Sequence, residues 1–175
     1  YFGGMKDLEN KILRAVGDPE KRFLEDALRI LRLFRFASVL GFSCEEKTLS
    51  AAIKHAYELK NVSGERIMSE LSKAVCGKNI EVFSTLLQSG GLEFLNLKYL
   101  PDFKKLSKLN FNSNLALFTF LYNSCDKKDL ISSLEFLKPS NNLKDYFIKF
   151  QKLLALAHPC EKTDIKTMLT LAEKQ

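Results

Sequence analysis

The stretch from Arg22 to Leu40 constrains the fold of this chain more than any other segment. It runs almost without interruption in residues that favour helices. Asp18 and Pro19 stand before it as a cap and a first helical residue, and Gly41 follows it as a stop. Large apolar side chains cover most of its faces, and burying each one contributes about 1.5–3 kcal/mol. The sequence therefore predicts one helix over this stretch, enclosed by other helices.

Short turns divide the rest of the chain into further helical segments. Eight Gly and four Pro among 175 residues leave few places for the turns that many strands would need. The predicted fold class is therefore all-α, a multi-helix array. The expected further helices cover residues 45–59, 64–77, 79–90, 113–124, 127–137, 141–158 and 164–174.

Composition divides the chain into three expected parts: a connector over residues 1–17, a helical domain over 18–90 and a second helical part over 91–175. All six Arg residues precede Gly90, whereas the last part carries thirteen Lys and no Arg. Lysines suit phosphate backbones, so we expect the last part to bind RNA. A coding bias that favours Lys would give the same composition.

The charge and the cysteines narrow the class of protein. A net charge of +6 and a pI near 9.1 favour an anionic partner. The four cysteines lie far apart without a Cys-x-x-Cys pair, and His55 and His158 have no second ligand nearby. We therefore expect no zinc site, no disulfide framework and a cytoplasmic protein with reduced thiols. The sequence holds no apolar run of the roughly 18 residues that a membrane span needs.

One stripe of the predicted helix is polar. At about 100° per residue, it gathers Arg22, Glu25, Asp26 and Arg29, with Arg32 at its rim. Because an unpaired buried charge is costly, such a stripe should face a partner charge or a cleft. Intrahelical ion pairs on a wet face are the alternative interpretation.

Ordered motifs fill residues 1–76. They read Phe2-Gly3-Gly4-Met5-Lys6-Asp7-Leu8, Arg14-Ala15-Val16-Gly17-Asp18-Pro19, Arg22-Phe23-Leu24-Glu25-Asp26-Ala27-Leu28-Arg29, Leu31-Arg32-Leu33-Phe34-Arg35-Phe36-Ala37, Leu40-Gly41-Phe42 and Ser63-Gly64-Glu65-Arg66-Ile67-Met68-Ser69-Glu70-Leu71. Together they closely resemble the bacterial (class II) tRNA nucleotidyltransferase and poly(A) polymerase family. After Gly77 the resemblance is limited to helical character.

The resemblance implies an enzyme that adds nucleotides to an RNA 3′ end and chooses CTP or ATP with side chains. Glu25, Asp26 and Arg29 match the family's selector motif. On a continuous helix, Asp26 would stand beside Arg29, accept the amino group of cytosine or adenine, and leave the ring acceptors to the guanidinium. Uracil and guanine would set a carbonyl oxygen against Asp26 and be rejected. Glu25 would orient or charge-balance Arg29.

Three further groups of residues take expected roles from the resemblance. Possible triphosphate or primer contacts, for which a structural role is equally open, are Arg22, Arg32 and Arg35. The expected hinge between a catalytic head and the neck, which an ordinary turn would also explain, comprises Gly3, Gly4 and Asp7. The expected braces around the selector are Glu65, Arg66 and Glu70.

The family's paired metal-binding carboxylates, which hold Mg²⁺ in an N-terminal head, have no match here. Asp7-Leu8-Glu9 is better interpreted as part of a helix. We therefore expect a neck, body and partial tail, with no catalytic residue or metal site of its own and inactive alone. ATP and CTP would be the substrates, and the tRNA acceptor and T arm the partner. A poly(A) polymerase of the same family and a non-enzymatic helical RNA-binding module are the alternatives.

Overall fold

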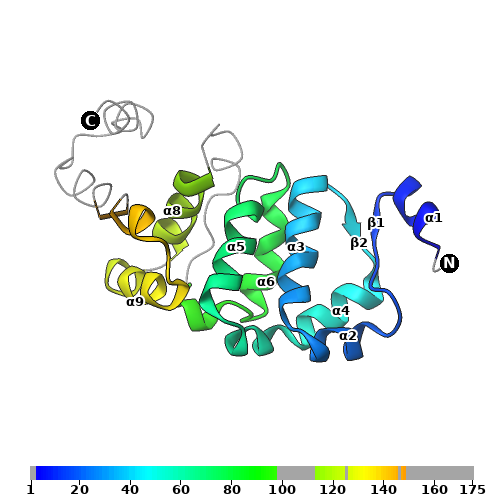
Figure 1. Cartoon of the computed structure of the whole chain (residues 1–175). Helices are drawn as coiled ribbons and strands as arrows, with labels where there is room; N and C mark the ends of the chain where they lie inside the picture. Colours follow the sequence, from blue (N-terminus) through cyan, green and yellow to red (C-terminus); the bar gives the residue numbers. More distant parts are fainter. Residues whose placement is uncertain (1–2, 98–112, 125, 146, 149–175) are drawn as a thin grey trace. The chain divides into compact units, whose positions relative to one another are not determined.

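The computed structural model describes residues 3–97, 113–124, 126–145 and 147–148 (Figure 1). The chain divides into two compact units, residues 1–138 and 139–175. The helices of the first unit are α1 (Gly4–Glu9), α2 (Pro19–Glu25), α3 (Leu28–Leu40), α4 (Glu46–Lys54), α5 (Gly64–Ala74), α6 (Phe83–Gln88), α8 (Ser113–Ser124) and α9 (Lys127–Leu137). Its 3-10 helices are η1 (Ala56–Asn61), η2 (Ile80–Val82) and η3 (Glu93–Leu95), and its strands are β1 (Ile12–Leu13) and β2 (Ser43–Cys44). In the second unit, residues 141–145 and 147–148 are helical.

The predicted all-α class is confirmed. The two strands are only two residues long and pair in parallel, with Ile12 opposite Ser43 and Leu13 opposite Cys44. The helices expected over 113–124 and 127–137 have those bounds. The helix expected over 45–59 ends at Lys54 and continues as η1, and that over 79–90 divides into η2 and α6. The helix expected over 164–174, and most of 141–158, lie outside the described residues.

The core of the first unit centres on α3 and α5, which lie side by side (Figure 1). Ile30 and Phe34 of α3 and Leu71 of α5 are fully buried. The two helices approach closely at their C-terminal ends, where the buried Ser38 hydroxyl donates to the Ala74 carbonyl at 2.8 Å. This approach explains Gly77, because a Cβ there would lie 2.5 Å from the Ser38 carbonyl carbon.

The single helix predicted over residues 22–40 is wrong, because the chain breaks between Glu25 and Leu28. Asp26 is extended, with φ −154° and ψ 102°. Its Oδ1 accepts from the Leu28 backbone N–H at 3.2 Å, and its carbonyl accepts from the Arg29 N–H at 3.0 Å. Asp favours such capping bonds over a helix interior. Asp26 therefore ends α2, and its side chain bonds the first residue of α3.

The first unit continues across Gly90-Gly91, where we expected a domain boundary. A Cβ at Gly91 would lie 2.6 Å from the Leu86 side chain and 2.9 Å from that of Ala56, so this turn is packed against its neighbours. Both α8 and α9, beyond the turn, contact α5. The division of the chain into three parts stays a prediction.

Candidate functional site

Four arginines surround a hollow of about 320 Å³ beside the start of α3. We call it the arginine hollow; its arginines are Arg14, Arg22, Arg29 and Arg32, and apolar side chains such as Phe36 complete its wall. Guanidinium groups donate several hydrogen bonds in a fixed plane and carry positive charge at all physiological pH values. The hollow can therefore receive an anionic ligand with hydrogen-bond acceptors.

Glu25 orients Arg29 within the arginine hollow. Its Oε2 accepts from Arg29 Nη1 at 2.9 Å and from Arg22 Nη1 at 2.7 Å, and Arg29 Nη1 also donates to the Arg22 carbonyl at 3.2 Å. The Arg29 side chain remains 35% exposed. An ion pair this open contributes less than about 1 kcal/mol to stability. The bond holds the Arg29 guanidinium beside Glu25, while the roles of Glu25 and Arg29 in selecting a base stay predictions.

Asp26 faces a second hollow, of about 300 Å³, at the α2–α3 junction. We call it the junction hollow; it is lined by Leu24, Glu25, Asp26, Ala27, Glu58, Asn61, Val62, Ser63 and Arg66. Asp26 Oδ2 accepts from Arg66 Nη2 at 2.9 Å. Arg29 is not among the lining residues. The helix break lies between Asp26 and Arg29, and their side chains bond different partners; that the two residues contact one base together stays a prediction.

The other predicted phosphate contacts divide into two kinds. Arg22 and Arg32 line the arginine hollow. Arg35 instead forms an ion pair with Glu70 of α5, with 2.6 Å between Nε and Oε2, and its guanidinium lies 3.9 Å from the centre of the Phe36 ring. The Arg35 and Glu70 side chains are only 16% and 12% exposed. For Arg35, the geometry favours the structural alternative.

The predicted braces all belong to α5, and each contacts a different part of the first unit. Arg66 contacts Asp26, Glu70 contacts Arg35, and Glu65 lies 3.7 Å from the Nζ of Lys138. The first two pairs join α5 to the α2–α3 region. In the Glu65–Lys138 pair both side chains are exposed, and neither residue lines the two hollows.

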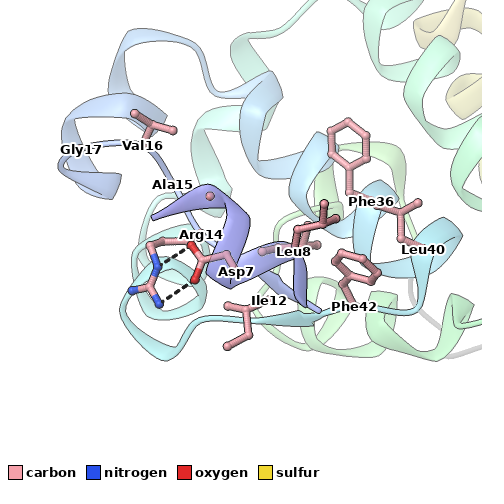
Figure 2. A pocket seen from close by; sticks show the side chains of 12 residues that line it. Asp7, Leu8, Ile12, Arg14, Ala15, Val16, Gly17, Phe36, Leu40 and Phe42 are labelled. Atoms are coloured by element: carbon pink, nitrogen blue, oxygen red, sulfur yellow. Dashed lines mark hydrogen bonds and ion pairs between the residues drawn. The ribbon is translucent and has the colours of Figure 1, made fainter. Parts of the chain in front are cut away.

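Arg14, for which the sequence predicted no role, connects residues 1–17 to the start of α4. Its guanidinium donates to Asp7 from Nε at 2.9 Å and from Nη2 at 3.3 Å (Figure 2), and also to Glu45. Glu45 accepts from the backbone N–H and the hydroxyl of Thr48, and that hydroxyl accepts from the Ala15 N–H. The Thr48 hydroxyl is the main cause of a lowered pKa of Glu45. The only sequence signal was the position of Arg14 in an ordered motif.

The expected hinge residues lie at the start of this connector. Gly3 has φ +74°, a left-handed conformation that favours glycine, and directly precedes α1. Gly4 and Asp7 belong to α1, as does the Asp7-Leu8-Glu9 run. Asp7 is held by Arg14, so the hinge role of these residues stays a prediction.

An apolar hollow of about 570 Å³ lies between α1, β1 and the end of α3. Figure 2 shows Leu8, Ile12, Phe36, Leu40 and Phe42 around it. Leu8 and Leu40 are each more than half exposed. Its lining offers few polar atoms, so it does not resemble a site for a charged substrate.

No group that could hold a metal ion occurs in the part of the chain that the structure describes: no three His, Cys, Asp or Glu side chains gather there. Among the helices of these residues, none combines the length and the apolar character that crossing a bilayer requires.

The first unit is a helical array with an arginine-lined hollow, and comparisons with known proteins identify its family. Residues 41–105 match the family model described as "Probable RNA and SrmB- binding site of polymerase A". The chain is 32% identical to the CCA-adding enzyme of Staphylococcus saprophyticus over 98% of this chain and 42% of that protein. It is 49% identical to the CCA-adding enzyme of Streptococcus gordonii over 59% of this chain and 25% of that protein.

A solved structure shares the fold. The crystal structure of Bacillus stearothermophilus CCA-adding enzyme in complex with CTP matches with a TM-score of 0.54 and 28% identity, over 82% of this chain and 41% of that one. The chain belongs to the tRNA nucleotidyltransferase family, as a partial region of it. It spans less than half the length of each of these three proteins.

Proposed function

We propose that this chain is the nucleotide-selecting and tRNA-binding region of a template-independent tRNA nucleotidyltransferase, which adds C, A or both to the tRNA 3′ end. The observation that carries the proposal is the arginine hollow, where Glu25 directs a partly exposed Arg29. The relatives' activity and the CTP in the Bacillus complex support it.

Base selection in this proposal rests on Asp26 and Arg29. Arg29 can donate to the ring nitrogen or carbonyl acceptors of cytosine or adenine, and Asp26 can accept from the exocyclic amino group. Uracil and guanine place an oxygen where that amino group lies, which sets an acceptor against a carboxylate. Arg22 and Arg32 line the same hollow as Arg29 and would meet the negative charge of the triphosphate.

We propose that the remaining parts of the reaction depend on other regions of the protein. We propose that Mg²⁺ is bound by carboxylates of a catalytic head elsewhere in the full-length protein, which acts in the cytoplasm. Residues 1–17 would connect that head to the helical domain of residues 18–90, with Gly3, Gly4 and Asp7 at the hinge. The lysine-rich region over 91–175 would follow the phosphates of the tRNA acceptor and T arm.

The test is nucleotide incorporation. The full-length protein that contains this chain, given Mg²⁺, radiolabelled CTP or ATP and a tRNA without its CCA end, should extend the tRNA. The chain alone should extend nothing, and incorporation by the purified chain would contradict the placement of the catalytic carboxylates elsewhere.

A poly(A) polymerase of the same family is the second candidate, because the matching family model describes a site of polymerase A. The same assay separates the two activities. Addition that stops after the CCA end indicates the tRNA enzyme, whereas a long tail made from ATP alone indicates the polymerase. A full-length protein that incorporates no nucleotide would contradict both.

A further inference from the structure

We infer that Arg66 sets the nucleotide affinity of the site, because it competes with the incoming base for the carboxylate of Asp26. The inference rests on the proposed function, in which one base contacts both Asp26 and Arg29. It gives Arg66 a role beyond bracing α5 against the α2–α3 junction.

Both carboxylate oxygens of Asp26 are engaged in the structure. Oδ1 accepts from the Leu28 N–H at 3.2 Å, and Oδ2 accepts from Arg66 Nη2 at 2.9 Å. The carboxylate thereby faces the junction hollow, whereas Arg29 faces the arginine hollow. In the proposed exchange, the amino group of the base takes the position that Arg66 Nη2 now holds at Oδ2, and the carboxylate turns towards Arg29.

Exposure shows that this ion pair can open at little cost. The Arg66 and Asp26 side chains are 52% and 31% exposed, and water and salt weaken such pairs. The pair of Arg35 with Glu70 also joins α5 to α3, but it is much more buried. The Arg35–Glu70 ion pair therefore keeps α5 against α3, whereas the more exposed Asp26–Arg66 ion pair can break so that Asp26 bonds another partner.

The backbone at the junction favours such an exchange. Asp26 lies outside both helices in an extended conformation, so its side chain can change orientation without unwinding α2 or the body of α3. The apparent dissociation constant of CTP or ATP, whose amino group binds Asp26, then equals the intrinsic constant divided by the fraction of protein in which the pair is open. Arg66 lowers that fraction for both nucleotides.

The experiment is equilibrium binding of CTP, ATP, UTP and GTP to the full-length protein without tRNA, so that no chemistry occurs. In Arg66→Ala, we expect dissociation constants about two- to fivefold lower for CTP and ATP but not for UTP and GTP, so that the preference for cytosine and adenine increases. Lys73→Ala is the matched control, since it removes a positive charge from the same helix, where Lys73 Nζ donates to the Ser69 hydroxyl at 3.2 Å; its dissociation constants should equal the parent's. High salt should narrow the difference between Arg66→Ala and the parent.

Weaker or unchanged binding of CTP and ATP in Arg66→Ala would overturn the inference, because a residue that only positions Asp26 would weaken binding and reduce discrimination when lost. A difference that persists at high salt would also overturn it. Arg66→Gln, which keeps most of the side chain's length, gives the same test if the alanine variant does not fold. A parent protein that adds no nucleotide to tRNA would instead refute the proposed function, so the two failures are distinguishable.

Discussion

Substitution of Glu70 by Gln should destabilise this chain strongly, because it leaves the charge of Arg35 without its partner. The two side chains approach to 2.6 Å and are 16% and 12% exposed. Breaking a buried ion pair from one side costs about 3–5 kcal/mol. Because some water reaches both groups here, we expect about 2–3 kcal/mol for Glu70→Gln. That is a large share of the roughly 5–15 kcal/mol that stabilises a typical protein.

Urea denaturation of the chain, followed by circular dichroism, measures this loss as a change in the unfolding free energy. The double variant Arg35→Met with Glu70→Met removes both charges and should recover to within about 1 kcal/mol of the parent. Glu65→Gln is the matched control on the same helix, since its partner Lys138 lies 3.7 Å away and both side chains are exposed. We expect less than about 0.5 kcal/mol for it.

Two results would refute this role of the Arg35–Glu70 pair. The first is a loss of unfolding free energy in Glu70→Gln that is no larger than in Glu65→Gln. The second is a loss in the double variant that equals the sum of the losses in its two single variants. Either result would mean that the ion pair with Glu70 does not hold Arg35 against α5. Arg35 would then be available to contact phosphate, as the sequence analysis also allowed.

Two further predictions follow from the ionisable groups. The pKa of Glu45 in the folded chain lies below its ordinary value of 4.5, mainly because the Thr48 hydroxyl donates to the Glu45 carboxylate. Glu45 therefore contributes its full share of stability above pH 4.5 and loses it as the pH falls through the pKa of the folded chain. Urea denaturation across acidic pH should show the gap between the parent and Glu45→Gln closing below pH 4.5, and a constant gap would contradict this. Burial raises the pKa of Cys44 to about 11, whereas Cys76 is exposed. Peptide mass spectrometry after brief iodoacetamide treatment at mildly alkaline pH should find Cys76 alkylated before Cys44, and equal rates for these two thiols would contradict the burial of Cys44.

The parts of the fold that depend on local pattern could be predicted from the sequence. The bounds of α8 and α9 agree with the expected ranges, because periodicity and capping residues act within a few positions. The bond between Glu25 and Arg29 is likewise a four-residue step, although the helix break lies between them.

The break at Asp26 shows where a prediction from helix propensity fails. Helix propensity over residues 22–40 favours continuity, but one Asp side chain that caps a helix contributes about 0.5–2 kcal/mol, which is enough to decide between two short helices and one long one. The signal was present, since Asp is a poor interior residue and a good cap. Nothing in the sequence indicated which tendency would prevail.

Long-range pairs could not be placed from the sequence. Asp26 and Arg66 are 40 positions apart, and Arg14 and Glu45 are 31 positions apart. Their meeting depends on how α5 and α4 pack against α2 and α3. The motifs indicated candidate site residues, whereas tertiary packing decided which hollow each one lines.

Base discrimination by the Arg29→Ala variant of the full-length protein tests the central claim most directly. Each nucleoside triphosphate is supplied singly with a tRNA that lacks its CCA end, and Arg32→Ala serves as the control from the same hollow. If Arg29 reads the base, its loss should reduce the preference for CTP and ATP over UTP and GTP by at least about tenfold, whereas Arg32→Ala should weaken all four nucleotides and keep the preference. An unchanged preference in Arg29→Ala, with only a uniform loss of rate, would contradict the account.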